Sequence, residues 1–195
     1  MSTTLRNTSR PRRVVTLTEM SLNPLSRSLA SEIDSVCGRP DLIVGISAPG
    51  MEVARQIATQ WQGIEVVGAK SHRSGTPFKR LAPVRWILRR LPRPVTDTLR
   101  VLESRFGSRP DAARTVTLPD AMPQLPQCPL VLIVDDAADS GATLLGAINA
   151  VRTVYADARI LTATIAVTRR DCVCPPRFSA LPPGLLVRFP WAPDA

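Results

Sequence analysis

Two adjacent aspartates and a loop of small polar residues are the part of this sequence whose residue types and spacing could do chemistry. Asp135 and Asp136 close an apolar run at residues 131–134, and a short loop follows them. The loop contains Asp139, Ser140, Gly141, Ala142 and Thr143. Carboxylates accept hydrogen bonds from sugar hydroxyls, whereas glycine lets the backbone approach an anion and hydroxyl groups donate to it. The stretch therefore predicts a site for a phosphorylated sugar.

The elements on either side would place this loop at the edge of a sheet. Residues 131–134 predict a buried strand, because all four are apolar and three are β-branched. A helix should run from Leu144 to about Tyr155, with unpaired N–H groups and about half a positive charge at its N-terminus. We expect the phosphate on the loop and the ribose hydroxyls on Asp135 and Asp136, which would also hold Mg²⁺ through those hydroxyls or through water. The alternative is a buried strand followed by a capped helix, but such a strand has no reason to end in two acids.

The stretch resembles the phosphoribosyl-pyrophosphate (PRPP) motif of the type I phosphoribosyltransferases, in which an apolar run and paired acids precede D-S-G-A-T. The resemblance covers residues 36–194, interrupted at residues 81–129, and the purine and xanthine-guanine branch is the most similar. It implies an α/β fold with a mostly parallel sheet, helices on both faces and a small C-terminal hood. It also implies a Mg²⁺-dependent enzyme of purine salvage, which transfers the 5-phosphoribosyl group from PRPP to a purine-like base and releases pyrophosphate.

Within this resemblance, Asp139 takes the position of the aspartate that 6-oxopurine enzymes use near N7 of the base. It is the candidate catalytic residue, because a carboxylate there can accept a proton as the glycosidic bond forms. Capping of the phosphate loop is the alternative role for this side chain. After the strand predicted at residues 159–167, the family's base-contacting lysine is replaced by Thr168-Arg169-Arg170. Arg169 is therefore expected to contact the base, although an arginine fork is not the point donor that a lysine is.

The pyrophosphate of PRPP is expected on a second loop, which the family uses through its backbone amides. The corresponding residues are Ser47, Ala48, Pro49 and Gly50. Ala-Pro replaces the commoner Arg-Gly pair, and proline removes one N–H donor, so a tight turn without a ligand is the alternative. Lys70 and Arg73 belong to a basic segment at residues 70–80 that corresponds to the family's mobile loop. The resemblance implies that they neutralise the leaving pyrophosphate.

The C-terminal residues 185–195 resemble the hood of the xanthine-guanine enzymes, in which an aromatic side chain near a Pro-Trp pair stacks on the base. Phe189 and Trp191 are therefore candidate base-binding residues. The alternative is that Trp191 only packs against the terminal strand.

The rest of the sequence predicts one domain over residues 14–195, after a flexible basic tail at residues 1–13. We expect helices at residues 24–37 and 52–61, the first because Asn23-Pro24 is typical of a helix start. We expect strands at residues 14–18, 41–47, 64–69, 116–118, 159–167 and 185–194. Mean hydropathy is +0.04, no run of about 18 uncharged apolar residues occurs, and the four cysteines lack metal-binding spacing. These features favour a cytoplasmic protein with reduced thiols over a membrane or zinc protein.

The net charge of +9 is concentrated in one segment of the chain. Between Lys70 and Arg114 there are twelve basic and three acidic residues, a surplus that equals the net charge of the whole sequence. Residues 81–114 are predicted to form a basic helical insertion, because their apolar residues have amphipathic spacing. It would pack on the sheet or on another subunit of an expected homodimer, or bind nucleic acid or an anionic membrane. Two alternatives to base transfer stay open: a PRPP or nucleotide sensor that binds nucleic acid, and transfer to a lipid or glycan acceptor.

Overall fold

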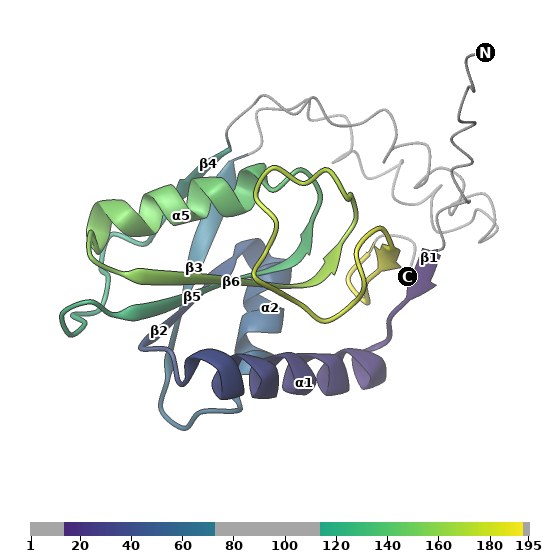
Figure 1. Ribbon diagram of the computed structural model, residues 1–195, viewed down its shortest axis with the longest axis horizontal. Coiled ribbons are helices and arrows are strands. Elements are labelled where there is room, and N and C mark those ends of the chain that lie inside the picture. Colours follow the sequence, from purple (N-terminus) through teal and green to yellow (C-terminus); the bar gives the residue numbers. More distant parts are fainter. Residues whose placement is uncertain (1–13, 73–113, 193–195) are drawn as a thin grey trace, which may run out of the picture.

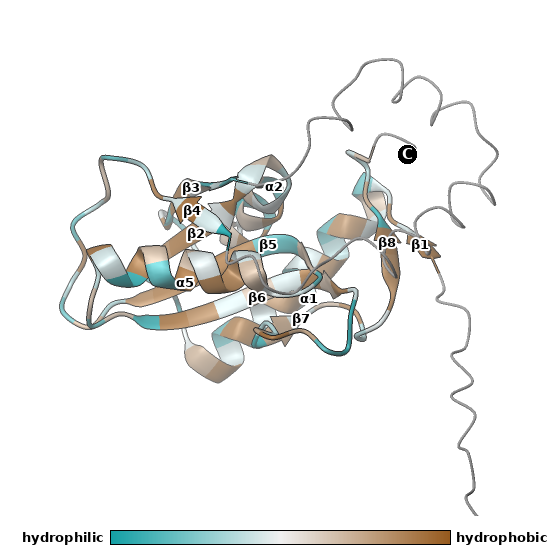
Figure 2. Ribbon diagram, turned by 90° about the horizontal axis from the view of Figure 1, so that it is seen from above, coloured by the Kyte–Doolittle hydropathy of each residue, from teal (hydrophilic) through white to brown (hydrophobic). Residues whose placement is uncertain are grey.

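The computed structural model describes residues 14–72 and 114–192, and a six-stranded sheet forms its centre (Figure 1). The strand order is β4-β3-β2-β5-β6-β7, and every neighbouring pair is parallel except β3 and β4. The strands are β2 (Leu42–Ile46), β3 (Glu65–His72), β4 (Thr115–Thr117), β5 (Leu130–Ala138), β6 (Arg159–Val167) and β7 (Phe178–Ser179). The central strands are mostly hydrophobic, as expected for a sheet covered on both faces (Figure 2).

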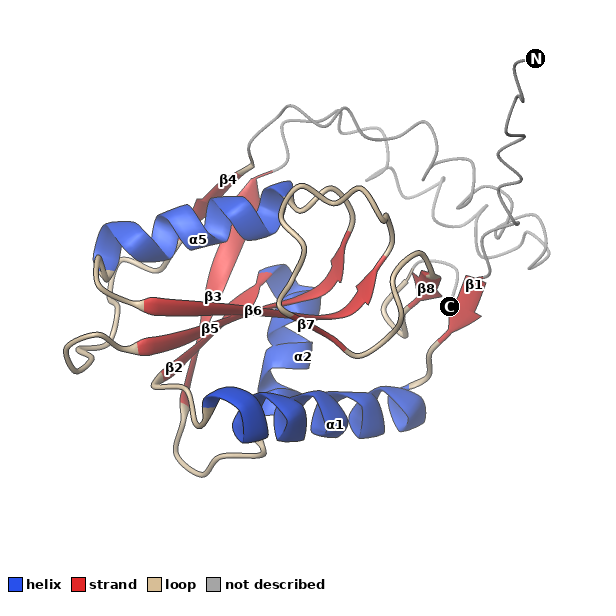
Figure 3. Cartoon of the chain, viewed as in Figure 1, coloured by secondary structure: helices blue, strands red, loops and turns tan. Residues whose placement is uncertain are grey.

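Three helices of the described residues cover the two faces of this sheet. Figure 3 shows α5 (Ala142–Val154) on one side of the strands and α1 (Glu19–Cys37) and α2 (Ser47–Ala58) on the other. The alternating side chains of β5 divide between two apolar cores, with Leu132 among residues of α1 and α2 and Ile133 among residues of α5. The prediction of an α/β fold with a mostly parallel sheet and helices on both faces is confirmed.

The chain changes direction across the sheet between β2 and β5. From β2 it passes through α2 to β3 on one side, and from β5 it passes through α5 to β6 on the other. The carboxyl ends of β2 and β5 therefore meet where α2 and α5 both begin. In open parallel sheets, such a switch point is the usual place for a ligand.

A small second sheet lies beyond the carboxyl ends of the central strands (Figure 1). It consists of β1 (Val14–Thr16) and β8 (Leu186–Arg188), which pair in parallel. The sequence predicted a strand near residue 14 but not its pairing with the C-terminal segment. The terminal strand predicted at residues 185–194 is much shorter, because the chain leaves the sheet after Arg188; residues 193–195 lie outside the described residues.

Both helices that were expected before residue 70 begin earlier than predicted. α1 begins at Glu19 rather than at Pro24, because Thr18 and Ser21 cap it reciprocally. The N–H of Thr18 donates to Ser21 Oγ at 2.9 Å, and the N–H of Ser21 donates to Thr18 Oγ1 at 3.3 Å. α2 begins at Ser47, so the predicted loop at residues 47–50 is its first turn.

Two strands are longer than predicted. β5 continues to Ala138 and β3 continues to His72, where it pairs with β4. The strand expected at residues 116–118 is found one residue earlier. The predicted tail at residues 1–13 and the predicted helical insertion lie outside the described residues, apart from Arg114.

Candidate active site

Two helices begin at the switch point, and neither N-cap residue forms a side-chain hydrogen bond to the first turn. The N-cap of α2 is the apolar Ile46, and that of α5 is Gly141. Neither first turn contains an acidic residue. The N–H groups and positive dipole end of such a helix attract anions. The described residues thus offer two positions for negative groups at the same edge of the sheet.

The first turn of α2 packs closely on β5. A Cβ at Gly50 would lie 2.9 Å from the carbonyl oxygen of Val134 and 3.0 Å from the Cα of Asp135, so a side chain does not fit. Ser47, the first residue of the helix, has a φ of 59°, which non-glycine residues adopt infrequently. Pro49 breaks no intrahelical hydrogen bond, because the first N–H groups of a helix have no partner within it. The four residues predicted to bind pyrophosphate therefore form a helix start beside the acid pair.

The acid pair lies inside β5 rather than after it. The prediction that Asp135 and Asp136 close the strand was wrong, because β5 extends to Ala138. Asp135 Oδ1 accepts a hydrogen bond from the N–H of Asp136 at 3.0 Å, and Asp136 Oδ1 accepts one from the N–H of Ala137 at 2.9 Å. Asp136 Oδ2 also accepts from Trp191 Nε1 at 3.2 Å, which joins the acid pair to the hood.

Burial raises the pKa of both carboxyls. The pKa of Asp135 is raised well above its ordinary value, because the residue is only 9% exposed and the charge of Asp136 adds to the effect of burial; Arg114 acts in the opposite direction. The pKa of Asp136 is also raised by burial, while the hydrogen bond from Trp191 partly lowers it. Such carboxylates are stabilised by a cation or by hydroxyl donors. A sugar and a hydrated metal would supply these groups.

The acid pair fits Mg²⁺ only together with other oxygen donors. Mg²⁺ requires six oxygen ligands and keeps several waters. Within residues 14–72 and 114–192, no group of three or more His, Cys, Asp or Glu side chains is placed to hold a metal ion. Two carboxylates alone do not complete such a set of ligands, so a metal held through sugar hydroxyls or water stays a prediction of the sequence.

The loop between β5 and α5 is covered by the segment that follows β6. Gly141 has a φ of 82°, and a Cβ there would lie 2.6 Å from the backbone nitrogen and oxygen of Cys174. The N–H of Val173 donates to the carbonyl oxygen of Ser140 at 2.9 Å. Ser140 Oγ in turn accepts from the N–H of Ala142 at 3.4 Å. Both the positive φ of the turn and the close approach of the Cys174 backbone therefore require a glycine at position 141.

Each end of this loop is held by a side chain that lies next to another strand. Asp139 Oδ1 accepts a hydrogen bond from Thr168 Oγ1 at 2.8 Å, and Thr143 Oγ1 accepts one from Arg114 Nη1 at 2.7 Å. Neither Thr168 nor Arg114 was predicted from the sequence to have a role in the site. Thr168 directly follows β6, the neighbour of β5 in the sheet. Its position at the carboxyl end of β6 could have predicted from the sequence that it lies near Asp139. Arg114 precedes β4 and had no such signal, because the pairing of β4 with β3 and its packing on α5 at Gly146 bring it to the loop.

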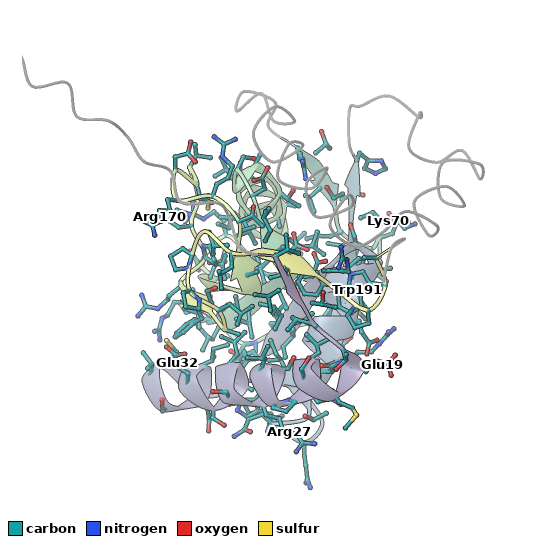
Figure 4. All side chains as sticks on the ribbon, turned by 90° about the vertical axis from the view of Figure 1, so that its right-hand side faces the viewer. Glu19, Arg27, Glu32, Lys70, Arg170 and Trp191 are labelled. Atoms are coloured by element: carbon teal, nitrogen blue, oxygen red, sulfur yellow. The ribbon has the colours of Figure 1, made fainter. Side chains whose placement is uncertain are left out.

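The candidate base-binding residues do not form one cluster. Phe189 is 6% exposed and stacks on Trp191, with ring centroids 5.0 Å apart and planes 7° from parallel. Arg169 Nε donates to Asp171 Oδ1 at 2.9 Å. Figure 4 shows Arg170 and Trp191 on opposite sides of the molecule. Phe189 therefore packs in the core, and Trp191 is the aromatic residue nearer to the acid pair.

Of the two basic residues predicted to neutralise pyrophosphate, the structure describes one. Lys70 was predicted in a loop but lies in β3, where it is exposed and pairs with Thr117 of β4. Arg73 lies outside the described residues.

A family model for the phosphoribosyl transferase domain matches residues 21–181, so the chain belongs to the phosphoribosyltransferase family. The protein is thus a phosphoribosyltransferase, which is a pentosyltransferase, and the resemblance found in residues 131–143 is confirmed. No curated protein gives a significant match to the chain.

Three solved structures share the fold over nearly the whole chain. The purine phosphoribosyltransferase of Pyrococcus horikoshii is 20% identical, with 92% of this chain and 94% of that chain covered and a TM-score of 0.63. The xanthine-guanine-hypoxanthine phosphoribosyltransferase of Helicobacter pylori is 15% identical, with the same coverage and a TM-score of 0.61. A hypothetical protein of Neisseria gonorrhoeae with bound ppGpp is 14% identical, with 93% and 90% covered and a TM-score of 0.62. At these identities the likeness shows the fold alone.

Among the described residues, no helix combines the length and the apolar character needed to cross a membrane.

Proposed function

We propose that this chain transfers the 5-phosphoribosyl group from PRPP to a purine-like base in the presence of Mg²⁺ and releases pyrophosphate. One observation carries the proposal: two helix N-termini lie at the switch point beside an acid pair, of which Asp135 is buried and Asp136 is half-buried. PRPP has the matching charge pattern, with phosphate groups at both ends of a ribose that carries two hydroxyls.

Three groups of residues bind the three parts of PRPP. Residues 139–143 bind the 5-phosphate with backbone N–H groups and hydroxyls at the start of α5. Asp135 and Asp136 accept hydrogen bonds from the ribose hydroxyls. The first turn of α2, at residues 47–50, receives the pyrophosphate. Lys70 is the described basic residue proposed to neutralise it, and the sequence predicts the same role for Arg73. The close packing of Gly50 on β5 supports this division, because it brings the first turn of α2 directly beside Asp135.

The acid pair also suits the charge that develops during transfer. Positive charge grows at the anomeric carbon as the bond to pyrophosphate breaks, and nearby carboxylates stabilise it. Mg²⁺, when bound, offsets the charge of the leaving pyrophosphate. The indole N–H of Trp191 holds Asp136 in position and lowers its pKa, so this carboxylate is kept ionised at a higher fraction than burial alone would allow.

For the acceptor, we propose a purine-like base between the hood and the loop after β5. Asp139 accepts a hydrogen bond from Thr168, which fixes the carboxylate that would take the proton from the base. Trp191 supplies an aromatic surface, with Phe189 stacked behind it. Arg169 would have to leave Asp171 to reach the base, so its contribution is expected to be the smallest.

The test is release of pyrophosphate from PRPP with Mg²⁺, measured across a panel of purine and pyrimidine bases. Release that depends on a 6-oxopurine and disappears in Asp139→Asn supports the proposal. Release with a pyrimidine alone would overturn the choice of acceptor. Tight PRPP binding without release for any base would favour the second candidate below.

The second candidate is a sensor that binds a nucleotide in the same place and transfers nothing. The observation that favours it is the Neisseria gonorrhoeae structure with bound ppGpp, which has this fold and a comparable TM-score of 0.62. A basic segment at residues 70–114 would then contact nucleic acid. Nucleic-acid affinity that falls with added salt and changes when ppGpp or PRPP is added would support this candidate.

A further inference from the structure

Arg114 is held against helix α5 by a glycine in the middle of that helix. A Cβ at Gly146 would lie 2.1 Å from the carbonyl oxygen of Arg114 and 3.2 Å from Cγ2 of Val116, so no other residue allows this approach. β4 therefore lies directly along α5 (Figure 1). Glycine weakens a helix interior relative to alanine, and its presence here places Arg114 at the N-terminal half of α5.

The guanidinium of Arg114 reaches the first turn of α5. Its Nη1 donates to Thr143 Oγ1 at 2.7 Å. It also lies close enough to Asp135 for its charge to favour the ionised form of that carboxyl. A guanidinium carries five N–H donors in a fixed planar fork, so the bond to Thr143 fixes the plane of the whole group beside the first turn of α5.

A cation at this end of a helix is in an unfavourable field. The N-terminus of α5 has the positive end of the helix dipole, where acidic side chains are stabilised and basic ones are not. The first turn of α5 has no acidic residue to compensate. The guanidinium already interacts with Asp135, and a phosphate bound to the loop would interact favourably with the dipole and with the guanidinium together.

We propose that Arg114 binds the 5-phosphate of the phosphoribosyl substrate and orients Thr143 toward it; this rests on the function proposed above. Because Thr143 Oγ1 accepts a hydrogen bond from Arg114, its own hydroxyl proton is directed away from the guanidinium and donates to the phosphate. The guanidinium adds a fixed charge to an anion site that otherwise consists of backbone N–H groups and hydroxyls. Arg114 is thus a substrate-binding residue that links the strand before the site to the phosphate loop.

The experiment measures two ligands by titration calorimetry with the full chain. Ribose 5-phosphate carries the 5-phosphate alone, and pyrophosphate with Mg²⁺ probes the other anion position. Arg114→Gln keeps a donor for Thr143 and removes the charge. We expect it to weaken ribose 5-phosphate binding by about ten- to hundredfold, as for loss of a charge-assisted hydrogen bond, and to change pyrophosphate binding by less than about threefold.

Two further variants separate binding from structure. Arg152→Gln removes an exposed arginine from the last turn of the same helix and should leave both affinities unchanged. Arg114→Lys keeps the charge and should retain most of the ribose 5-phosphate affinity, which also covers the case in which Arg114→Gln does not fold. The Arg114→Gln and Thr143→Val effects should be less than additive if both side chains serve one phosphate.

The outcomes are distinct for this proposal and for the proposed function. If wild type binds ribose 5-phosphate and Arg114→Gln binds it equally well, the role of Arg114 is overturned and the proposed function stands. If Arg114→Gln loses affinity for both ligands in proportion to a lower melting temperature, the binding role of Arg114 is likewise overturned, because the residue would then be structural. If wild type binds neither ribose 5-phosphate nor pyrophosphate, the proposed function itself fails, and the role of Arg114 fails with it.

Discussion

Replacement of Gly50 by alanine tests whether α2 begins against the acid pair. A Cβ at this position would lie 2.9 Å from the carbonyl oxygen of Val134, 3.0 Å from the Cα of Asp135 and 3.1 Å from its Oδ1. The first two are backbone atoms of β5, and β5 is held on both sides by β2 and β6. The strand cannot give way, so the first turn of α2 must move.

The expected cost follows from two opposing effects. Overpacking costs about 1–3 kcal/mol, and contact with rigid backbone places this case near the upper end. Alanine has a helix propensity that is better than that of glycine by about 1 kcal/mol, which offsets part of the cost. The net loss should be about 2 kcal/mol, and for a chain of this length that lowers the melting temperature by about 4–8 °C.

The assay compares thermal unfolding of wild type, Gly50→Ala and Gly68→Ala. Gly68 is an exposed residue of β3, and the nearest atom to a Cβ there is Met51 Sδ at 3.9 Å, so this control should change stability by less than about 0.5 kcal/mol. Gly50→Ala should also weaken PRPP binding, because the pyrophosphate position moves away from Asp135. Equal melting temperatures for the two variants would refute the close approach of α2 to β5.

Three further predictions concern other single side chains. Burial raises the pKa of Asp135, so ionisation of this side chain destabilises the folded state at pH values above the pKa of the same group in the unfolded chain. The melting temperature of Asp135→Asn should therefore exceed that of wild type at about pH 8, and the difference should vanish towards about pH 4. A difference that grows at low pH would contradict this. Trp191→Phe removes a hydrogen bond that lowers the pKa of Asp136, so PRPP binding should be lost at a higher pH on acidification than in wild type. An unchanged dependence of PRPP affinity on pH would mean that the indole N–H does not hold this carboxylate. The exposed Cys128 should react with a thiol reagent at least about tenfold faster than Cys172, because burial raises the pKa of the Cys172 thiol. Mass spectrometry of partly labelled protein shows which of the two cysteines reacts first.

The central motif could be predicted because its chemistry is contiguous in the sequence. Two acids beside an apolar run and a D-S-G-A-T loop specify a strand, a turn and a helix start without any distant contact. The left-handed φ of Gly141 and the burial of Asp135 agree with that interpretation. The α/β topology followed for the same reason, since strands and helices alternate in strongly apolar segments.

Features set by tertiary packing could not be predicted in this way. The start of α2 at Ser47 depends on Gly50 fitting against β5, and the sequence shows only a Pro-Gly pair that suggested a loop. The start of α1 depends on a Thr18–Ser21 box, whose serine replaces the glutamate of the usual pattern, so Asn23-Pro24 was the stronger signal. Arg114 reaches Thr143, 29 positions along the chain, because β4 pairs with β3 and packs on α5 at Gly146.

The central claim is that the acid pair and the two helix N-termini form a PRPP site. The most direct test is equilibrium binding of PRPP with Mg²⁺ to wild type and to the double variant Asp135→Asn, Asp136→Asn, which keeps the size of both side chains. We predict measurable binding by wild type and a loss of at least about a hundredfold in the variant, while its fold is retained and its melting temperature is not lowered. Equal binding by both proteins, or none by wild type, would contradict the account.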